Sequence, residues 1–349
     1  SPVSRVGGIV LGAMLGALLL AACAPAGPAH SAANAGAEAG TLFVANKRGN
    51  SLSKIDLASG EEVLRVPSCA NPHELATSPD GQHVALACYG GTTVDIFRTT
   101  DLSRVTSIDL GENARPHGIV WQQDSALGRD QIFATAEGRR SAFVIDYPTG
   151  GDPDLTEIPT GKIGSHMIAV SPDGAFAWTM DLGSGTATLI EVRDARALRS
   201  VAVGVEPEGI ALSPDGKALW VSARGSDKAF ELDPITLELR REVATGRFPL
   251  RLAIRPQGDV AVTSDLADGG LSVIDIRTGK LLRKIAVSGP SEAEARQQVT
   301  ILWSHDGRRT YAAETGSDTV AEVDFASGKV LRRLKTGEGG DGMAILGGR

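Results

Sequence analysis

The sequence has few aromatic residues, cysteines and methionines, and these scarcities narrow the range of functions. Only 4% of the 349 residues are aromatic, and the chain has 3 Cys and 4 Met. No Cys-x-x-Cys-His motif occurs, which excludes covalently attached c-type haem. The net charge is −7, and no basic tract with interleaved aromatic residues is present. The electrostatic footprint of nucleic-acid binding is therefore missing.

Long apolar runs are also scarce, and the one near the start resembles an export signal. It spans residues 7–22, which is too short for a comfortable transmembrane helix. Arg5 precedes it and Leu20-Ala21-Ala22-Cys23 ends it, a pattern typical of a bacterial lipobox. We expect residues 1–23 to be a lipoprotein signal peptide with Cys23 lipidated. A plain signal peptide cut near Ala22 or Ala26 is the alternative.

The segment that follows, residues 24–40, is rich in Ala, Gly and Pro and shows no apolar period. Such a composition indicates a flexible tether. We therefore expect an exported protein of the bacterial cell envelope, at its periplasmic or outer-membrane face. The lipid would be its only contact with the membrane.

Glycine, in contrast, is abundant at 42 residues, and much of it belongs to a repeated phrase. The phrase is clearest at 207–216 (Pro-Glu-Gly-Ile-Ala-Leu-Ser-Pro-Asp-Gly) and recurs at 72–81 and 165–174, with a period of roughly 43 residues. Its Ser-Pro-Asp-Gly end is turn chemistry, and short β-rich runs lie between the turns. The unit that begins at 207 predicts four strands, at 209–213, 218–223, 228–233 and 238–244.

The repeats predict an all-β, seven-bladed β-propeller over residues 41–349, built from four-stranded antiparallel blades. Six copies begin near Ala70, Ala114, Gly164, Glu206, Phe248 and Gln298. The copy after Ala114 lacks the turn phrase, and we place Trp121 in its degenerate turn. A seventh unit supplies three strands near the start, at 41–46, 51–56 and 61–66. Its missing strand is predicted at 342–346, so the C-terminal strand closes the ring in the first blade; an open solenoid would instead need polar capping repeats.

Two runs and the Ser-Pro-Asp-Gly turns carry a resemblance to a known family. Leu-Phe-Val-Ala-Asn at 42–46 and Ser-Val-Ile-Asp-Ile-Arg-Thr-Gly-Lys at 272–280 resemble the YVTN repeats of YncE-like bacterial β-propellers. The resemblance covers about residues 41–349 and implies the propeller fold. Relatives with this fold include lactonases, lyases and haem-bearing redox domains, so the resemblance leaves the activity open.

The start of each first strand is expected at one mouth of the central channel. Aligning the repeats gives His73, His117, His166, Glu208, Leu250 or Arg251, a position near Gln298, and Asp341 or Gly342. The second strands should end at the same mouth, at Asn46, Cys88, Ala136, Asp181, Ala223, Asp265 and Glu314. From these sets we predict a ligand-binding site made of His73, His117, His166, Glu208, Arg251, Asp181 and Glu314.

Histidine is concentrated in this predicted mouth, with three of the six in the chain at one phase of the repeat. Imidazole and carboxylate groups bind divalent transition metals, so His73, His117 and His166 are candidate metal ligands. The alternative is that they are polar channel-lining residues, bonded to water and backbone. Arg251 either offers a cation to an anionic ligand or forms a salt bridge to Glu208 or Asp265.

Cys69 and Cys88 are expected to meet beside this mouth. Extending the register of the first hairpin from Thr77 places Cys88 across from about Pro72, and Cys69 lies three residues further out. Export to an oxidising compartment favours a disulfide between them. The alternative is a Cys88 thiolate beside His73 that acts as a metal ligand or a nucleophile.

Taken together, these features predict an exported, membrane-anchored propeller that binds a ligand or protein through a His-rich channel mouth. A small molecule or an envelope protein is the expected partner, and the protein is expected to be a monomer. One alternative is a metal-dependent, lactonase-like hydrolase or lyase at the same mouth. A further alternative is a redox accessory domain that binds haem non-covalently.

Overall fold

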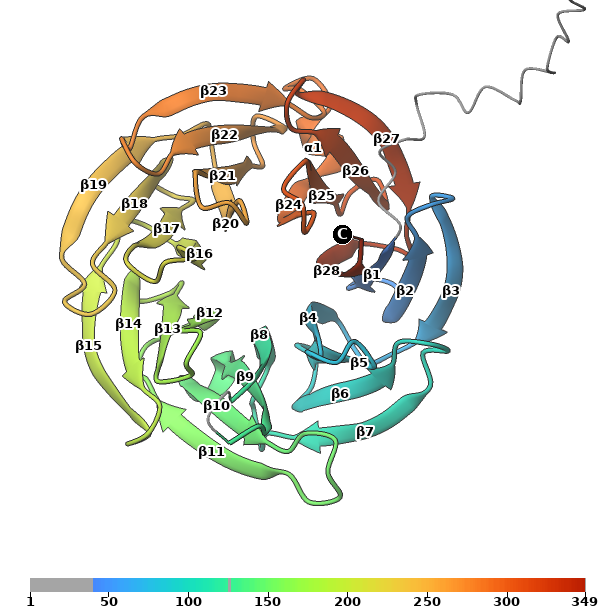
Figure 1. The fold of residues 1–349 in the computed structure, drawn as a ribbon, viewed down its shortest axis with the longest axis vertical. Helices are drawn as coiled ribbons and strands as arrows, with labels where there is room; N and C mark the ends of the chain where they lie inside the picture. Colours follow the sequence, from blue (N-terminus) through green and yellow to red (C-terminus); the bar gives the residue numbers. More distant parts are fainter. Residues whose placement is uncertain (1–39, 125–126, 349) are drawn as a thin grey trace, which may run out of the picture. The chain divides into compact units, whose positions relative to one another are not determined.

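The computed structural model describes residues 40–124 and 127–348. Over these residues the chain forms seven four-stranded antiparallel sheets around a ring, so the predicted seven-bladed propeller is confirmed (Figure 1). The expected signal peptide at 1–23, with Cys23, lies outside the described residues. The expected tether at 24–40 lies outside them as well, except for Gly40.

Blades 2 to 7 follow one another along the chain, and each takes four consecutive strands from the channel outward. Blade 2 has β4 (Pro72–Thr77), β5 (His83–Cys88), β6 (Thr93–Arg98) and β7 (Arg104–Asp109), and blade 3 has β8 (Pro116–Gln123), β9 (Asp130–Ala136), β10 (Ser141–Asp146) and β11 (Asp154–Pro159). Blade 4 has β12 (Ser165–Val170), β13 (Phe176–Asp181), β14 (Thr186–Glu191) and β15 (Arg196–Ala202), and blade 5 has β16 (Pro207–Leu212), β17 (Leu219–Ala223), β18 (Lys228–Leu232) and β19 (Leu239–Ala244). Blade 6 has β20 (Pro249–Ile254), β21 (Val260–Asp265), β22 (Gly270–Asp275) and β23 (Leu281–Ala286), and blade 7 has β24 (Gln298–Trp303), β25 (Arg309–Glu314), β26 (Thr319–Asp324) and β27 (Lys329–Lys335).

Blade 1 joins the two ends of the propeller. It combines β1 (Gly40–Asn46), β2 (Ser51–Asp56) and β3 (Glu61–Pro67) with the C-terminal strand β28 (Gly340–Gly347). The strands β28 and β1 pair antiparallel and lie side by side in Figure 1. The predicted closure of the ring by the C-terminal strand is therefore confirmed.

Side-chain hydrogen bonds and a glycine with positive φ stabilise the repeated Ser-Pro-Asp-Gly turn, as its residue types predict. In blade 5 the Ser213 hydroxyl donates to Asp215 Oδ1 at 2.6 Å, and the Lys217 amide donates to the same oxygen at 3.0 Å. Gly216 has φ +71°, a left-handed conformation that glycine adopts without steric cost. With these turns fixing the hairpins, the four predicted strands of this unit agree with β16 to β19 to within two residues.

One local prediction is wrong. Trp121 lies inside β8, where it pairs with Ile132, and not in a turn. Its side chain is buried between blades 2 and 3. Trp121 has the same phase as Val170, the last residue of β12, and β8 continues beyond it to Gln123.

The core is divided among the blade interfaces. Within residues 40–124 and 127–348 there are seven buried apolar clusters, one between each pair of neighbouring blades. The cluster between blades 7 and 1, with Tyr311 and Leu42, is one of them, so the ring closes by packing as well as by strand pairing.

The described part of the chain has two short helices, η1 (Glu137–Arg139) and α1 (Ala293–Arg296), which lie in loops. Neither of these helices has the length and apolarity to cross a membrane.

Candidate functional site: the mouth of the central channel

A cavity of about 580 Å³ opens at one end of the central channel, and every blade contributes to it. The second residue of each innermost strand lines it: His73, His117, His166, Glu208, Leu250, Val299 and Asp341. The residue that follows each second strand also lines it: Lys47, Tyr89, Glu137, Leu182, Arg224, Leu266 and Thr315. These two rings supply most of the wall of the site.

A register shift that recurs in every blade positions the residues of the first ring. Each innermost strand shifts its register against its neighbour near its start. In blade 4, for example, Ser165 pairs with Asp181 and Met167 with Met180, so His166 is an extra residue. A β-bulge of this kind changes the direction of the side chain at the extra position. Here that side chain lines the cavity.

Of the seven site residues predicted from the sequence, five line this cavity: His73, His117, His166, Glu208 and Arg251. At the three positions where the repeat alignment left a choice, the residues of the first ring are Leu250, Val299 and Asp341. Arg251 follows Leu250 in the chain and also lines the cavity.

Asp181 and Glu314 lie elsewhere, inside their blades. The Asp181 carboxylate accepts hydrogen bonds from Ser165, Thr179, Thr186 and Thr188 at 2.6–2.9 Å. Glu314 accepts a hydrogen bond from Arg333 at 2.9 Å. Side chains alternate in direction along a strand, so the last strand residue points into the blade and the next residue lines the mouth. Each residue of the second ring therefore directly follows the strand end that the repeat alignment gave, so the sequence could have identified this ring.

The three histidine rings lie in a row across blades 2 to 4. The ring centroids of His73 and His117 are 4.8 Å apart, and those of His117 and His166 are 3.5 Å apart and stacked. Stacked rings do not aim their nitrogens at one centre. Among the described residues, the only group of three metal-binding side chains with ligand atoms all within 4.8 Å is Cys69, Cys88 and Asp95, so the histidines form no such group.

The environments of the histidines give them different charges. Burial lowers the pKa of His73 to about 4 and holds that of His117 well below its ordinary value, so both rings are neutral. Burial acts on His166 in the same direction, but the carboxylates of Glu208 and Glu137 outweigh it and raise its pKa. His166 Nδ1 lies 2.8 Å from Glu137 and Nε2 lies 2.9 Å from Glu208, so a protonated ring donates to both.

The His117 ring keeps one unused polar atom. Its Nδ1 is buried and has no hydrogen-bond partner in the described part of the structure, and the residue is only 1% exposed. Nearly all buried polar groups in proteins are hydrogen-bonded. Solvent does not reach this nitrogen, so it does not by itself mark a binding position for a ligand in the cavity.

A buried ion network lies at the same end of the channel. Arg251 Nη1 contacts Glu74 Oε1 at 2.7 Å, across the ring from blade 6 to blade 2, and Arg251 Nε contacts Glu208 Oε2 at 3.0 Å. Burial raises the pKa of Glu74 to about 7. For Glu208 burial is outweighed by Arg251 and His166, which lower its pKa to about 2. The network bridges opposite blades where the channel begins.

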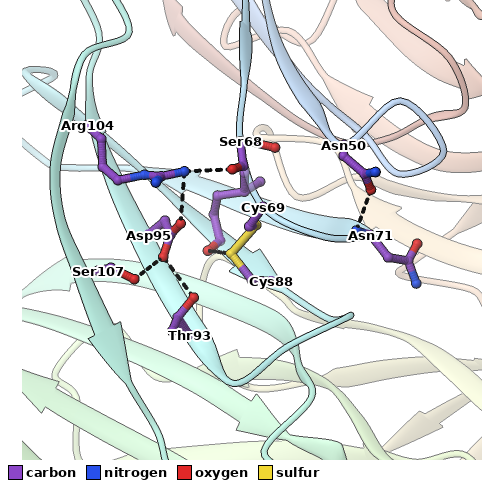
Figure 2. The surroundings of a disulfide bond; sticks show 10 residues. Asn50, Ser68, Cys69, Asn71, Cys88, Thr93, Asp95, Arg104 and Ser107 are labelled. Atoms are coloured by element: carbon purple, nitrogen blue, oxygen red, sulfur yellow. Dashed lines mark hydrogen bonds and ion pairs between the residues drawn. A yellow bond between two sulfur atoms is a disulfide. The ribbon is translucent and has the colours of Figure 1, made fainter.

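Figure 2 shows the surroundings of a disulfide in blade 2. Cys69 and Cys88 are joined in a disulfide with a Cα–Cα distance of 5.8 Å, so Cys88 is not a free thiol beside His73. Asp95, which lies next to the bond, accepts hydrogen bonds from Thr93 and Ser107 at 2.8 and 2.6 Å. Since Tyr89 follows Cys88 directly and its ring centroid lies 4.5 Å from that of His73, the bond ties together two parts of the cavity wall.

Comparison with known proteins shows the family of this chain. Residues 113–348, more than half of the chain, match the PQQ_2 family, described as outer membrane protein assembly factor BamB. The chain belongs to this family. Comparison of this PQQ_2 propeller with curated proteins gives no match.

Solved structures resemble it in fold. A functionally unknown protein from Desulfotomaculum acetoxidans DSM 771 has a TM-score of 0.72 and 14% identity, over 88% of this chain and 99% of that one. Dihydro-heme d1 dehydrogenase NirN in complex with DHE has a TM-score of 0.63 and 16% identity, over 87% and 74%. Apo AztD from Citrobacter koseri has a TM-score of 0.62 and 14% identity, over 89% and 99%. At these identities the likeness shows the fold alone.

Proposed function

We propose that this PQQ_2 propeller is a non-enzymatic binding module that holds a small ligand in the channel-mouth cavity. The observation that carries the proposal is the row of three histidine rings, His73, His117 and His166, in the wall of that cavity. Two further features support it. Each of the seven blades places a bulged residue at the mouth, and the volume of about 580 Å³ falls in the range typical of small-molecule sites.

The test is a thermal-shift screen of metabolites and metal ions with the wild type, His117→Ala and His83→Ala. His83 begins β5, outside the cavity, and serves as the matched control. A ligand that binds only the native state raises the unfolding temperature. We expect at least one compound to stabilise the wild type and His83→Ala but not His117→Ala. Equal shifts in all three proteins, or no shift with any compound, would contradict the proposal.

Anchorage in the cell envelope is part of the same proposal. The Leu-Ala-Ala-Cys motif that ends at Cys23 supports lipidation and export, and the YVTN-like repeats support a relationship to YncE-like propellers. Cys23→Ser is expected to release the protein from the membrane fraction. Unchanged membrane retention of that variant would refute the anchor while leaving the cavity proposal standing.

A metal-dependent hydrolase or lyase is the second candidate. The neutral rings of His73 and His117, with Asp341 3.5 Å from His73 Nδ1, favour it because neutral imidazoles and carboxylates bind transition metals. The stacked geometry and the two carboxylates on His166 oppose it, since metal binding would require the rings to move. Elemental analysis of protein purified without a His-tag decides the point, because this candidate requires stoichiometric metal that is lost in His117→Ala.

Non-covalent haem binding is a weaker candidate. The structure of NirN, titled as a complex with DHE, is similar in fold to this chain, and neutral histidines line the cavity here. Addition of haemin should then give a Soret band that His117→Ala and His73→Ala weaken. An unchanged spectrum of free haemin would rule this candidate out.

A further inference from the structure

The outer strands of the blades differ in charge around the ring. Those of blades 6 and 7, β23 and β27, together carry six basic residues and no acidic one. Those of blades 1 and 3, β3 and β11, carry four acidic residues and one basic one. Since the net charge of the whole chain is −7, β23 and β27 form a local basic surface on an acidic protein.

Part of this positive charge is neutralised within the fold, and part is free. Arg332 and Arg333 form ion pairs with glutamates of their own blade. The ammonium groups of Lys280, Lys329 and Lys335 are different, because these residues are exposed and their ammonium groups have no ion pair or hydrogen bond among the described residues. Their charge is therefore available to a partner.

Exposed leucines lie among these lysines. Leu282 in β23 is 55% exposed and Leu331 in β27 is 49% exposed. Arg283 donates to the backbone oxygens of Phe325 and Ala326, just before β27, so the two strands are neighbours at the outer edge of the ring (Figure 1). The exposed side chains of this surface, here called the basic rim, are Lys280, Leu281, Leu282, Lys329, Leu331 and Lys335.

The combination of leucine with lysine distinguishes the basic rim from other outer edges. Lysine alone on an exposed edge strand discourages unwanted strand pairing. An exposed apolar side chain also occurs on β3, where Val63 is 52% exposed, but there Glu61 and Glu62 precede it. At a bilayer that contains anionic lipid, lysines are attracted to the phosphate groups and leucines enter the interface. Both kinds of side chain in the basic rim are then used.

The start of the described fold lies beside the basic rim. The Gly40 carbonyl accepts a hydrogen bond from the Leu57 amide at 2.9 Å, and the Leu57 carbonyl accepts one from Arg332 of β27. The chain that leads from Cys23 therefore enters the propeller next to β27. A lipid on Cys23, as proposed above, would tether the propeller to the membrane from this side, and a lipid chain combined with a basic patch binds membranes more firmly than either alone.

We propose that the basic rim is a second membrane contact, which places the outer edge of blades 6 and 7 against a bilayer surface containing anionic phospholipid. This inference goes beyond the proposed function, because the basic rim shares no residue with the channel-mouth cavity. It also adds a contact made by the protein itself to the expected lipid anchor.

Vesicle flotation of the full chain carrying Cys23→Ser tests the inference, because this variant has no lipid on residue 23. At low ionic strength we expect it to float with vesicles of equal parts phosphatidylglycerol and phosphatidylcholine, and not with vesicles of phosphatidylcholine alone. Added salt should release it, because salt screens exposed charges. A contact this sensitive to salt is consistent with the expected release of Cys23→Ser from cell membranes.

Charge-reversal variants in the same background locate the contact. Each lysine near an anionic membrane contributes about fivefold in affinity, so Lys280→Glu combined with Lys329→Glu should weaken vesicle binding at least about tenfold. Lys162→Glu combined with Lys217→Glu is the control, because it changes the net charge equally at lysines outside the basic rim. This control should bind as the parent does, within about twofold.

The apolar part of the contact has its own matched pair of variants. Leu282→Asn should weaken vesicle binding roughly threefold or more, because less apolar surface enters the interface. Val63→Asn, at a position nearly as exposed on the acidic strand β3, should leave binding unchanged.

Several results would overturn the inference. These are equal binding to the two kinds of vesicle, binding to neither, or equal losses in the lysine pair of the rim and the control pair. If soluble polyglutamate binds in a way that depends on Lys280 and Lys329 while the vesicles do not bind, the basic rim is a site for an acidic macromolecule and the membrane inference falls. None of these results bears on ligand binding in the channel-mouth cavity.

Discussion

Replacing Arg251 by methionine should destabilise the propeller strongly, because Arg251 is the cation between two buried carboxylates. It lies 3.0 Å from Glu208 and 2.7 Å from Glu74, and all three side chains are at most 9% exposed. In Arg251→Met both acids lose this partner at positions that are largely shielded from water. Removing one member of a buried ion pair typically costs about 3–5 kcal/mol.

The pKa of Glu208 agrees in direction. Arg251, His166 and Arg224 together outweigh burial and lower it from 4.5 to about 2, a net difference of about 3 kcal/mol for the whole set. Because the pKa is lower in the folded state, this stabilisation is fully present above about pH 4.5 and is lost as the pH falls towards 2. The cost of Arg251→Met should therefore be about 3–5 kcal/mol at pH 7.5 and smaller near pH 3.

Urea unfolding followed by tryptophan fluorescence measures this cost. Arg196→Met is the matched control, because Arg196 is 64% exposed and pairs with Glu191 at the surface, where an ion pair contributes roughly 0–1 kcal/mol. Glu208→Gln added to Arg251→Met should recover part of the loss, since it removes one unpaired buried charge. An Arg251→Met variant no less stable than Arg196→Met would refute the reasoning.

Three further predictions concern the disulfide and two acids buried inside the blades. Cys69→Ser should lower stability by about 3 kcal/mol, the value expected for a loop of this length, and dithiothreitol should then have no added effect. Asp181→Ala leaves four hydroxyl groups without their acceptor and should cost roughly 3 kcal/mol in urea unfolding, whereas a cost near zero would contradict its structural role. Burial raises the pKa of Asp265 to about 7, so its stabilising effect is lost as the pH rises from about 4 through 7. Asp265→Asn should flatten the pH dependence of unfolding in that window, and an unchanged profile would count against the pKa shift.

The fold was readable from the sequence because turn chemistry recurs with the repeat. Proline, aspartate and glycine fix each hairpin locally, so strand positions in blade 5 and the closure by β28 follow without knowledge of distant contacts. The pairing of Cys88 with Pro72 followed from the same hairpin register. Trp121 was misplaced because its copy lacks the turn phrase, and burial between blades decided its position.

The sequence predicted only some of the cavity residues, for two physical reasons. A register shift at the start of each first strand gives the ring, and the repeat phase located His73, His117, His166 and Glu208 in it. The residues predicted at the ends of the second strands lie one position before those that line the cavity. Side chains alternate in direction along a strand, so Asp181 points into its blade. The contact between Arg251 and Glu74 joins residues 177 positions apart and depends on ring closure, which no local pattern encodes.

The most direct test of the central claim is a crystal structure of the protein with the most strongly stabilising compound from the thermal-shift screen. The account predicts electron density for that compound in the channel-mouth cavity, in contact with the side chains of His73, His117 and His166. Density for the compound elsewhere on the propeller, with the cavity holding only water, would contradict it.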